Sequence, residues 1–148
     1  MKQKLRGRLL LACVLLPALA SCKKPAPPPS AETSAPTVIA FRVTSIDVGR
    51  AVGADKRIAQ PVTTFGPRDT IYASVVTEGA ASAAVITARW SFQDGQVVNE
   101  MSESISPTGP AATEFHITKG SPWPAGNYAV EVSVNGAPSG RKDFTVTN

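Results

Sequence analysis

Short runs of alternating apolar and polar residues, separated by turn residues, constrain the fold of this chain more than any other feature. The clearest run covers residues 127–134. Its four large apolar side chains, which alternate with smaller or polar ones, are those of Tyr128, Val130, Val132 and Val134. A repeat of two places successive side chains on opposite faces of a strand. No long stretch from residue 38 onward has a helical period. The pattern therefore predicts an all-β fold.

The same alternation predicts further strands on either side of this run. They cover residues 38–48, 70–77, 84–92, 96–101, 112–118 and 141–147. A short strand is also expected near 57–58 or 62–65, and residues 102–106 are expected to continue irregularly. Asp94-Gly95 supplies the positive-φ residues of a tight two-residue hairpin, and Asn135-Gly136 is expected to turn the chain before the last strand. Seven or eight antiparallel strands are predicted, in a β-sandwich whose core includes Trp90 and Phe92.

The N-terminal segment has a different composition. Four basic residues come first: Lys2, Lys4, Arg6 and Arg8. An apolar run of about 12 residues follows over 9–20, which is shorter than the roughly 20 that a membrane-spanning helix requires. A positive region followed by a short apolar run is typical of a secretion signal, and residues 1–21 are interpreted as one.

The signal ends in Leu19-Ala20-Ser21-Cys22, which resembles the lipobox of bacterial lipoproteins. The resemblance implies lipid transfer to the Cys22 thiol and cleavage between Ser21 and Cys22, so that the mature chain is held in a membrane by its lipid. Lys23 follows Cys22. An aspartate at this position would resemble an inner-membrane retention signal, and its absence favours the outer membrane of the cell envelope. An ordinary signal peptide with a chance cysteine, or a short buried helix, is the alternative.

Removal of residues 1–21 changes how the composition is interpreted. The full chain has a formal net charge of +4, but four of its 15 basic residues and none of its 11 acidic residues lie in this segment. The mature chain is therefore balanced in charge, and no nucleic-acid partner is predicted. Both cysteines, Cys13 and Cys22, precede residue 23, so a disulfide within the domain is excluded.

Residues 22–37 are expected to form a lipidated linker ahead of the domain at 38–148. Five prolines dominate this segment: Pro25, Pro27, Pro28, Pro29 and Pro36. Proline fixes φ and has no backbone donor, so an extended spacer is predicted. A PxxP-type partner motif is the alternative.

A family resemblance appears in Gly126-Asn127-Tyr128-Ala129-Val130. It resembles the G-x-Y-x-C run of the tyrosine corner in immunoglobulin-like domains, and Trp90 lies where such folds place a core tryptophan. The resemblance implies that the Tyr128 hydroxyl bonds back to the turn. Val130 replaces the cysteine, which leaves a bacterial immunoglobulin-like or fibronectin-type variant. The region from Trp123 to Val146 also resembles uncharacterised bacterial envelope lipoproteins.

The domain has few residues suited to catalysis. His116 is its single histidine, and the alternation places it outward beside Glu114. There is no G-x-S-x-G elbow and no zinc or calcium spacing. Glu100 and Glu103 are three positions apart, on opposite faces of a strand. No catalytic residue, metal or cofactor is therefore predicted, and the protein is expected not to be an enzyme.

Trp123, within Ser121-Pro122-Trp123-Pro124, is the candidate binding residue of the domain. An exposed ring could stack on a sugar or on a partner surface. The alternative is that the ring plugs the end of the sandwich.

Three functions follow as hypotheses. The leading one is a non-enzymatic envelope module whose domain binds a protein partner or has a structural role, with strand addition as one mode of binding. The second is binding of glycan, including peptidoglycan, through Trp123. The third is a hydrolase that uses His116.

Overall fold

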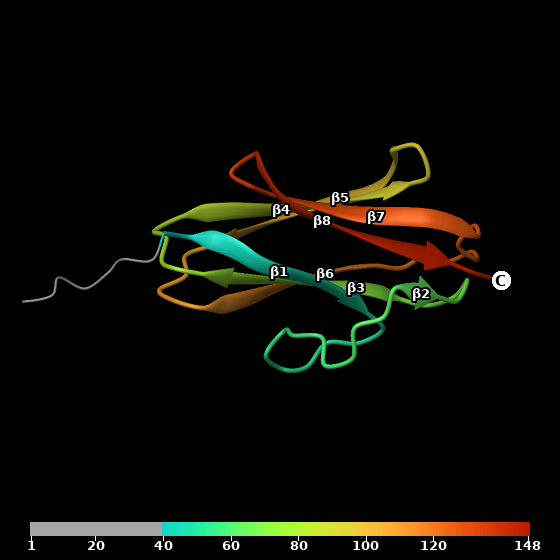
Figure 1. Cartoon of the computed structure of the whole chain (residues 1–148), viewed down its shortest axis with the longest axis horizontal. Coiled ribbons are helices and arrows are strands. Elements are labelled where there is room, and N and C mark those ends of the chain that lie inside the picture. Colours follow the sequence, from blue (N-terminus) through green and yellow to red (C-terminus); the bar gives the residue numbers. More distant parts are fainter. Residues whose placement is uncertain (1–39) are drawn as a thin grey trace, which may run out of the picture. The chain divides into compact units, whose positions relative to one another are not determined.

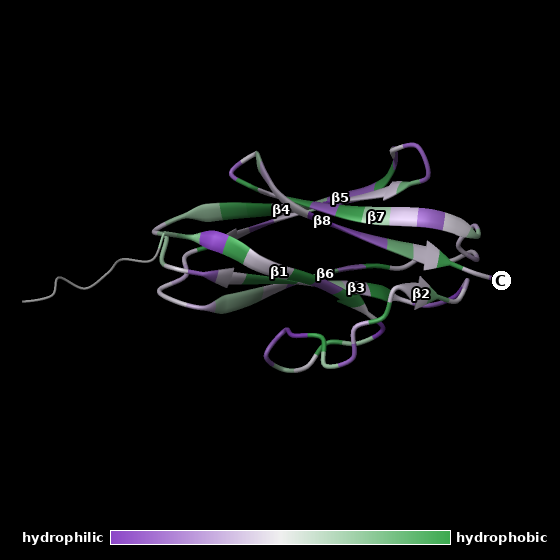
Figure 2. Ribbon diagram, viewed as in Figure 1, coloured by the Kyte–Doolittle hydropathy of each residue, from purple (hydrophilic) through white to green (hydrophobic). Residues whose placement is uncertain are grey.

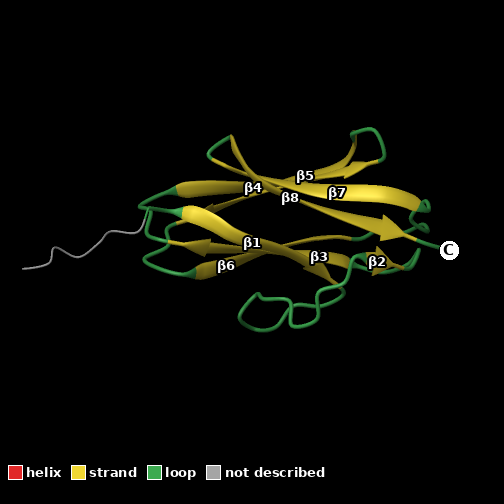
Figure 3. Ribbon diagram, viewed as in Figure 1, coloured by secondary structure: helices red, strands yellow, loops and turns green. Residues whose placement is uncertain are grey.

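The computed structural model describes residues 40–148. The predicted signal, Ser21, Cys22 and the whole linker lie outside the described residues. The described part consists of eight strands in two sheets packed face to face (Figure 1), and it contains no helix (Figure 3). The strands are β1 Arg42–Gly49, β2 Thr64–Phe65, β3 Ile71–Glu78, β4 Ala84–Phe92, β5 Gln96–Ile105, β6 Ala111–Ile117, β7 Gly126–Val134 and β8 Ala137–Val146. Accordingly, no helix within 40–148 could cross a membrane.

The two sheets have the orders β1-β3-β6 and β2-β8-β7-β4-β5. The predicted sandwich of seven or eight strands is therefore confirmed. One pairing departs from the prediction, because β2 is parallel to β8 while the other named strand pairs are antiparallel. The two-residue β2 follows a long connection that returns the chain along the C-terminal end of β8, so the direction of pairing is set by that connection and not by a hairpin.

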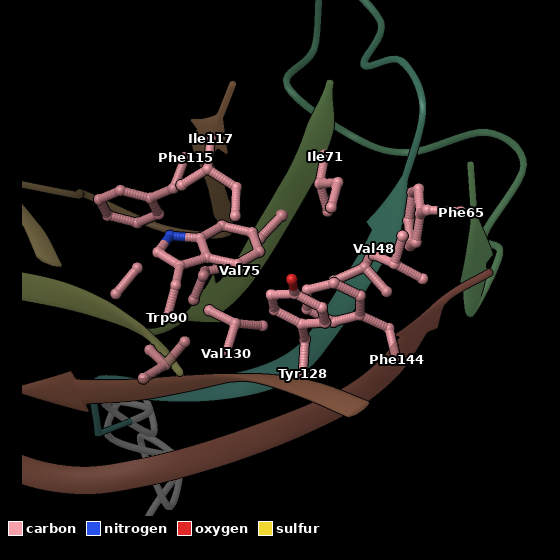
Figure 4. Packing of buried hydrophobic residues seen from close by; sticks show 14 of the residues in the cluster. Val48, Phe65, Ile71, Val75, Trp90, Phe115, Ile117, Tyr128, Val130 and Phe144 are labelled. Carbon is pink, nitrogen blue, oxygen red and sulfur yellow. The ribbon is translucent and has the colours of Figure 1, made fainter. Parts of the chain in front are cut away.

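Apolar residues alternate along the strands, as the hydropathy colours of Figure 2 show, and their side chains meet between the sheets (Figure 4). Trp90 is fully buried and meets the Phe144 ring edge-on at 6.0 Å. Phe144 also stacks on Tyr128 at 5.4 Å. Aromatic pairs at these separations add about 0.5–1.5 kcal/mol each beyond the area they bury. The core therefore contains an aromatic cluster centred on Phe144.

The connection over residues 50–63 covers the outer face of the three-stranded sheet. The Ser74 hydroxyl donates to the carbonyl of Lys56 at 2.7 Å. A Cβ at Gly49 would lie 2.6 Å from Ile58 Cγ2, so glycine permits this close approach. This cover explains why Ser74, on the outer face of β3, is buried.

Two details around β5 differ from the predictions. The β4–β5 turn uses three residues, with positive φ at Gln93 and Gly95, where a two-residue turn at Asp94-Gly95 was expected. The strand then continues regularly to Ile105, where irregular structure was expected after residue 101. The register shifts opposite Trp90/Ser91, which leaves Val98 as an extra residue in β5. Beyond this bulge Phe92 is only half-buried, so its predicted core position is partly wrong.

Candidate binding groove beside β5

The loop between β6 and β7 is tied to the sandwich by the predicted tyrosine corner. The Tyr128 hydroxyl donates to the carbonyl of Pro124 at 2.9 Å, which confirms the bond implied by the resemblance. Burial raises the pKa of the Tyr128 hydroxyl, which therefore stays protonated and able to donate. The beginning of β7 and the residues before it are thereby held as one unit.

Trp123 lies at the end of the sandwich and is only 6% exposed. Its indole Nε1 donates to the carbonyl of Asp69 at 3.0 Å, and its backbone nitrogen donates to the carbonyl of Pro67 at 2.7 Å. The ring meets Tyr128 edge-on at 6.2 Å. This is the position of a plug. The glycan hypothesis requires an exposed ring that can stack on a sugar, and the Trp123 ring is buried.

A polar network holds the turn to which Trp123 is bonded. The Asp69 carboxylate accepts from Arg50 Nε at 2.7 Å and from the Gly66 backbone at 2.8 Å. These two donors, the Gly66 amide first, hold the pKa of Asp69 below its ordinary value of 3.8. Arg50 also donates to the carbonyl of Thr64 and lies 5.4 Å above the Phe65 ring centroid. The turn that contains Asp69, to which the Trp123 indole is bonded, is therefore fixed by several hydrogen bonds.

A groove of about 360 Å³ opens between this plugged end and the beginning of β5. Its lining is a mixture of apolar and uncharged polar side chains with one cation: Phe92, Gln96, Val97, Val98, Asn99, Ile117, Thr118, Lys119, Trp123, Pro124 and Tyr128. Val97 is 48% exposed. Because of the bulge, the neighbours Val97 and Val98 both line the groove, although alternation would place them on opposite faces.

Lys119 is the charged residue of this lining. Its Nζ lies 5.8 Å from the centroid of the Trp123 ring. None of the ion pairs found within residues 40–148 includes Lys119. The groove thus combines an apolar wall with one cation that no carboxylate of the described residues neutralises.

β5 is the last strand of the five-stranded sheet and pairs there with β4 alone. A strand in this position leaves backbone N–H and C=O groups unpaired along its outer side, where another strand can bind. The groove lies at the beginning of this edge, since four of its lining residues are the first four of β5. The edge and the groove are therefore continuous.

The outer face of the same sheet is different in character. Its charges form a chain across four strands, from Glu100 through Arg89 and Glu131 to Arg141 and Asp143. Each side chain has a partner of opposite sign, and exposed pairs of this kind contribute about 0–1 kcal/mol. This face is consistent with a solvated surface.

The remaining polar residues singled out in the sequence are dispersed. His116 faces outward as predicted, with 54% of its side chain exposed, and its Nδ1 lies 2.8 Å from Glu114 Oε1. Glu100 pairs with Arg89, and Glu103 pairs with Lys56, as expected for opposite faces. No cluster of three metal-ligating side chains occurs among residues 40–148.

Together the two sheets, the aromatic core and the tyrosine corner define an immunoglobulin-like β-sandwich. Among solved structures, an immunoglobulin-like protein from Pseudomonas aeruginosa is similar, with 13% identity and a TM-score of 0.51 over 75% of this chain and 99% of that one. This likeness shows the fold alone. A scan of family models gave no match, and neither did a search of curated proteins.

Two enzymes of known structure contain a segment whose fold is similar to that of this chain. One is an alkylpurine DNA glycosylase of Pseudomonas fluorescens bound to DNA, at 16% identity and a TM-score of 0.48 over 73% of this chain. The other is a β-glucosidase of Erythrobacter marinus, at 9% identity and 0.48 over 73%. This chain spans 30% and 15% of their respective lengths. At these TM-scores neither likeness says anything about activity here.

Proposed function

We propose that this protein is a non-enzymatic interaction module of the bacterial cell envelope. It is held at a membrane by lipid on Cys22, and it binds a partner protein along the free edge of β5. The observation that carries the binding role is the continuity of this edge with the groove beside Val97. An edge strand offers backbone hydrogen bonds, and an adjoining groove offers a place for a side chain of the partner.

Membrane attachment is supported by Leu19-Ala20-Ser21-Cys22, which lies at the end of a signal-like segment. One acyl chain gives only reversible binding, whereas two or three hold a protein stably. The outer membrane is the proposed location because Lys23 follows the cysteine. The proline-rich residues 23–37 then serve as a spacer that lets the domain meet a partner.

The glycan alternative loses its main support from the position of Trp123. Sugar recognition by stacking needs an open aromatic face, and this ring is buried against Tyr128 and bonded to Asp69. Protein binding at the β5 edge does not depend on an exposed face of Trp123.

Site-specific photocrosslinking in the native bacterium tests the binding role. A benzophenone amino acid is placed at Ser104, an exposed residue of β5, or at Ser139, an exposed residue of β8. We expect a discrete adduct with one envelope protein from Ser104 and none from Ser139. No adduct at Ser104, or the same adduct from both positions, would contradict binding at the β5 edge.

A further inference from the structure

We propose that the groove beside β5 receives a large apolar side chain of an extended partner peptide, while Lys119 binds a carboxylate on the same peptide. This inference rests on the proposed function and specifies the chemistry of the partner. The occupant is a strand-forming segment that carries an apolar residue next to aspartate or glutamate.

The bulge in β5 makes the apolar part of the site. Val98 is the extra residue opposite Trp90/Ser91, and it brings Val97 and Val98 to the same groove. Phe92 forms a further part of the wall and is held against the Tyr128 ring at 4.6 Å. Bulges next to binding sites commonly redirect side chains in this way.

The size of the groove favours a side chain over a whole small molecule. Ligand pockets occupy about 300–1,000 Å³, and this groove, at about 360 Å³, lies near the lower limit. Val97 is one of only two large apolar side chains within residues 40–148 that are strongly exposed, and the other, Val85, does not line the groove. Covering Val97 would therefore remove from water one of the few large apolar side chains that the folded domain leaves exposed.

Charge complementarity decides which apolar peptide fits. Lys119 has no carboxylate partner among the described residues. The other side chains that line the groove are uncharged, so Lys119 gives the lining a formal charge of one positive unit. An ammonium beside apolar surface binds a carboxylate more strongly than one in open water, because the local dielectric is lower. A basic peptide in the same groove would place two cations together.

The site is preformed, which favours selective binding. Trp123 is held by the carbonyls of Asp69 and Pro67, and Tyr128 is held by the carbonyl of Pro124. Side chains that are already fixed lose little freedom when a ligand binds. The Lys119 side chain is the part that must still be ordered, and it already lies near the Trp123 ring.

The test uses the full-length lipidated protein in detergent micelles and four fluorescein-labelled hexapeptides. Two carry leucine with aspartate one or two residues further on, and the other two have lysine in place of aspartate. Fluorescence anisotropy gives the affinities. We expect the better aspartate peptide to bind about tenfold tighter than its lysine counterpart, because the exchange replaces attraction to Lys119 with repulsion. Replacing its leucine with alanine should weaken binding by about tenfold or more.

Charge reversal assigns the preference to Lys119. In Lys119→Glu the lysine peptides should become the tighter ligands. The control Arg57→Glu changes an exposed cation that does not line the groove, and it should leave the order unchanged. The same order of affinities in Lys119→Glu as in the wild type, or no binding of either aspartate peptide at about 1 mM, would overturn the proposal.

Two further outcomes separate this inference from the proposed function. Displacement of the bound peptide by a chitin tetrasaccharide would show a glycan site and overturn the inference. Failure of all four peptides together with a specific adduct at Ser104 would leave the edge function standing and remove the groove as its specificity site. If no peptide binds and Ser104 gives no adduct, both the groove inference and the proposed edge function are wrong.

Discussion

Asp69 joins three segments of the chain through two of its oxygen atoms. Its carboxylate accepts hydrogen bonds from Arg50 and from the Gly66 amide, and its carbonyl accepts one from the Trp123 indole. These donors favour the ionised carboxylate, so the pKa of Asp69 is lower in the folded protein than in the unfolded chain. The unfolded chain therefore binds more protons at acidic pH, and the stability that this group contributes rises with pH.

Replacing Asp69 with asparagine should make the stability of the protein less dependent on pH. The Asp69 contribution is fully present above the unfolded pKa of about 3.8 and is lost as the pH falls through the lower folded pKa. We expect the difference in unfolding free energy between pH 7 and pH 3, measured with urea, to be smaller in Asp69→Asn than in the wild type. Arg50→Gln removes only one of the two donors, so its effect should be smaller. An unchanged difference in Asp69→Asn would contradict this role.

Residues whose partners are close in sequence were the predictable ones. The bond from Tyr128 reaches back four positions to Pro124, and the local motif indicates it. Trp123 could not be placed in the same way, because it is buried by a turn 54 positions earlier in the chain. Lys119 had no signal at all, since the absence of an ion-pair partner depends on the folded arrangement of distant charges.

Two glycines mark the ends of β7 and have different reasons for being glycine. Gly136 has φ +81° in the β7–β8 turn, and an added Cβ would meet no atom within 4 Å. Gly126 has φ +151°, and an added Cβ would lie 2.8 Å from Phe92 Cε2. Only the second glycine therefore combines a restricted backbone with crowding at the groove wall.

Alanine at these two positions should have unequal effects on stability. Gly136→Ala is expected to cost about 1 kcal/mol for the left-handed backbone alone. Gly126→Ala should cost about 1–3 kcal/mol more, because the added methyl displaces Phe92 from its contact with Tyr128. Urea unfolding of both variants measures the two costs. Equal costs would show that Phe92 moves aside freely.

Strands that the alternation covers in full were predicted well. β4 matches the expected residues 84–92, because its one buried face produces a clean repeat of two. β5 was predicted too short, because an edge strand with a bulge has a weaker pattern, and its extra residue Val98 breaks the repeat. The parallel pairing of β2 depends on a long connection, whose course short-range signals do not indicate.

For the whole molecule, the alternation of apolar and polar residues predicted the β-sandwich but not the groove. The groove is assembled from β4, β5, β6, β7 and the loop between β6 and β7, and of its lining the sequence pointed to a role only for Tyr128 and Trp123. The balanced charges of residues 22–148 also give no electrostatic reason for a location at anionic lipid. The proposed location therefore depends on covalent lipid at Cys22, and the proposed interaction depends on the β5 edge.

Intact mass spectrometry of the protein purified from the membrane fraction is the decisive experiment, because the proposed location depends on lipid at Cys22. We expect a chain that begins at Cys22 and carries diacylglycerol on the thiol, and a Cys22→Ala variant that gains no lipid and is not cleaved there. A wild-type chain that begins at another residue, or one whose Cys22 thiol is unmodified, would contradict the proposed location.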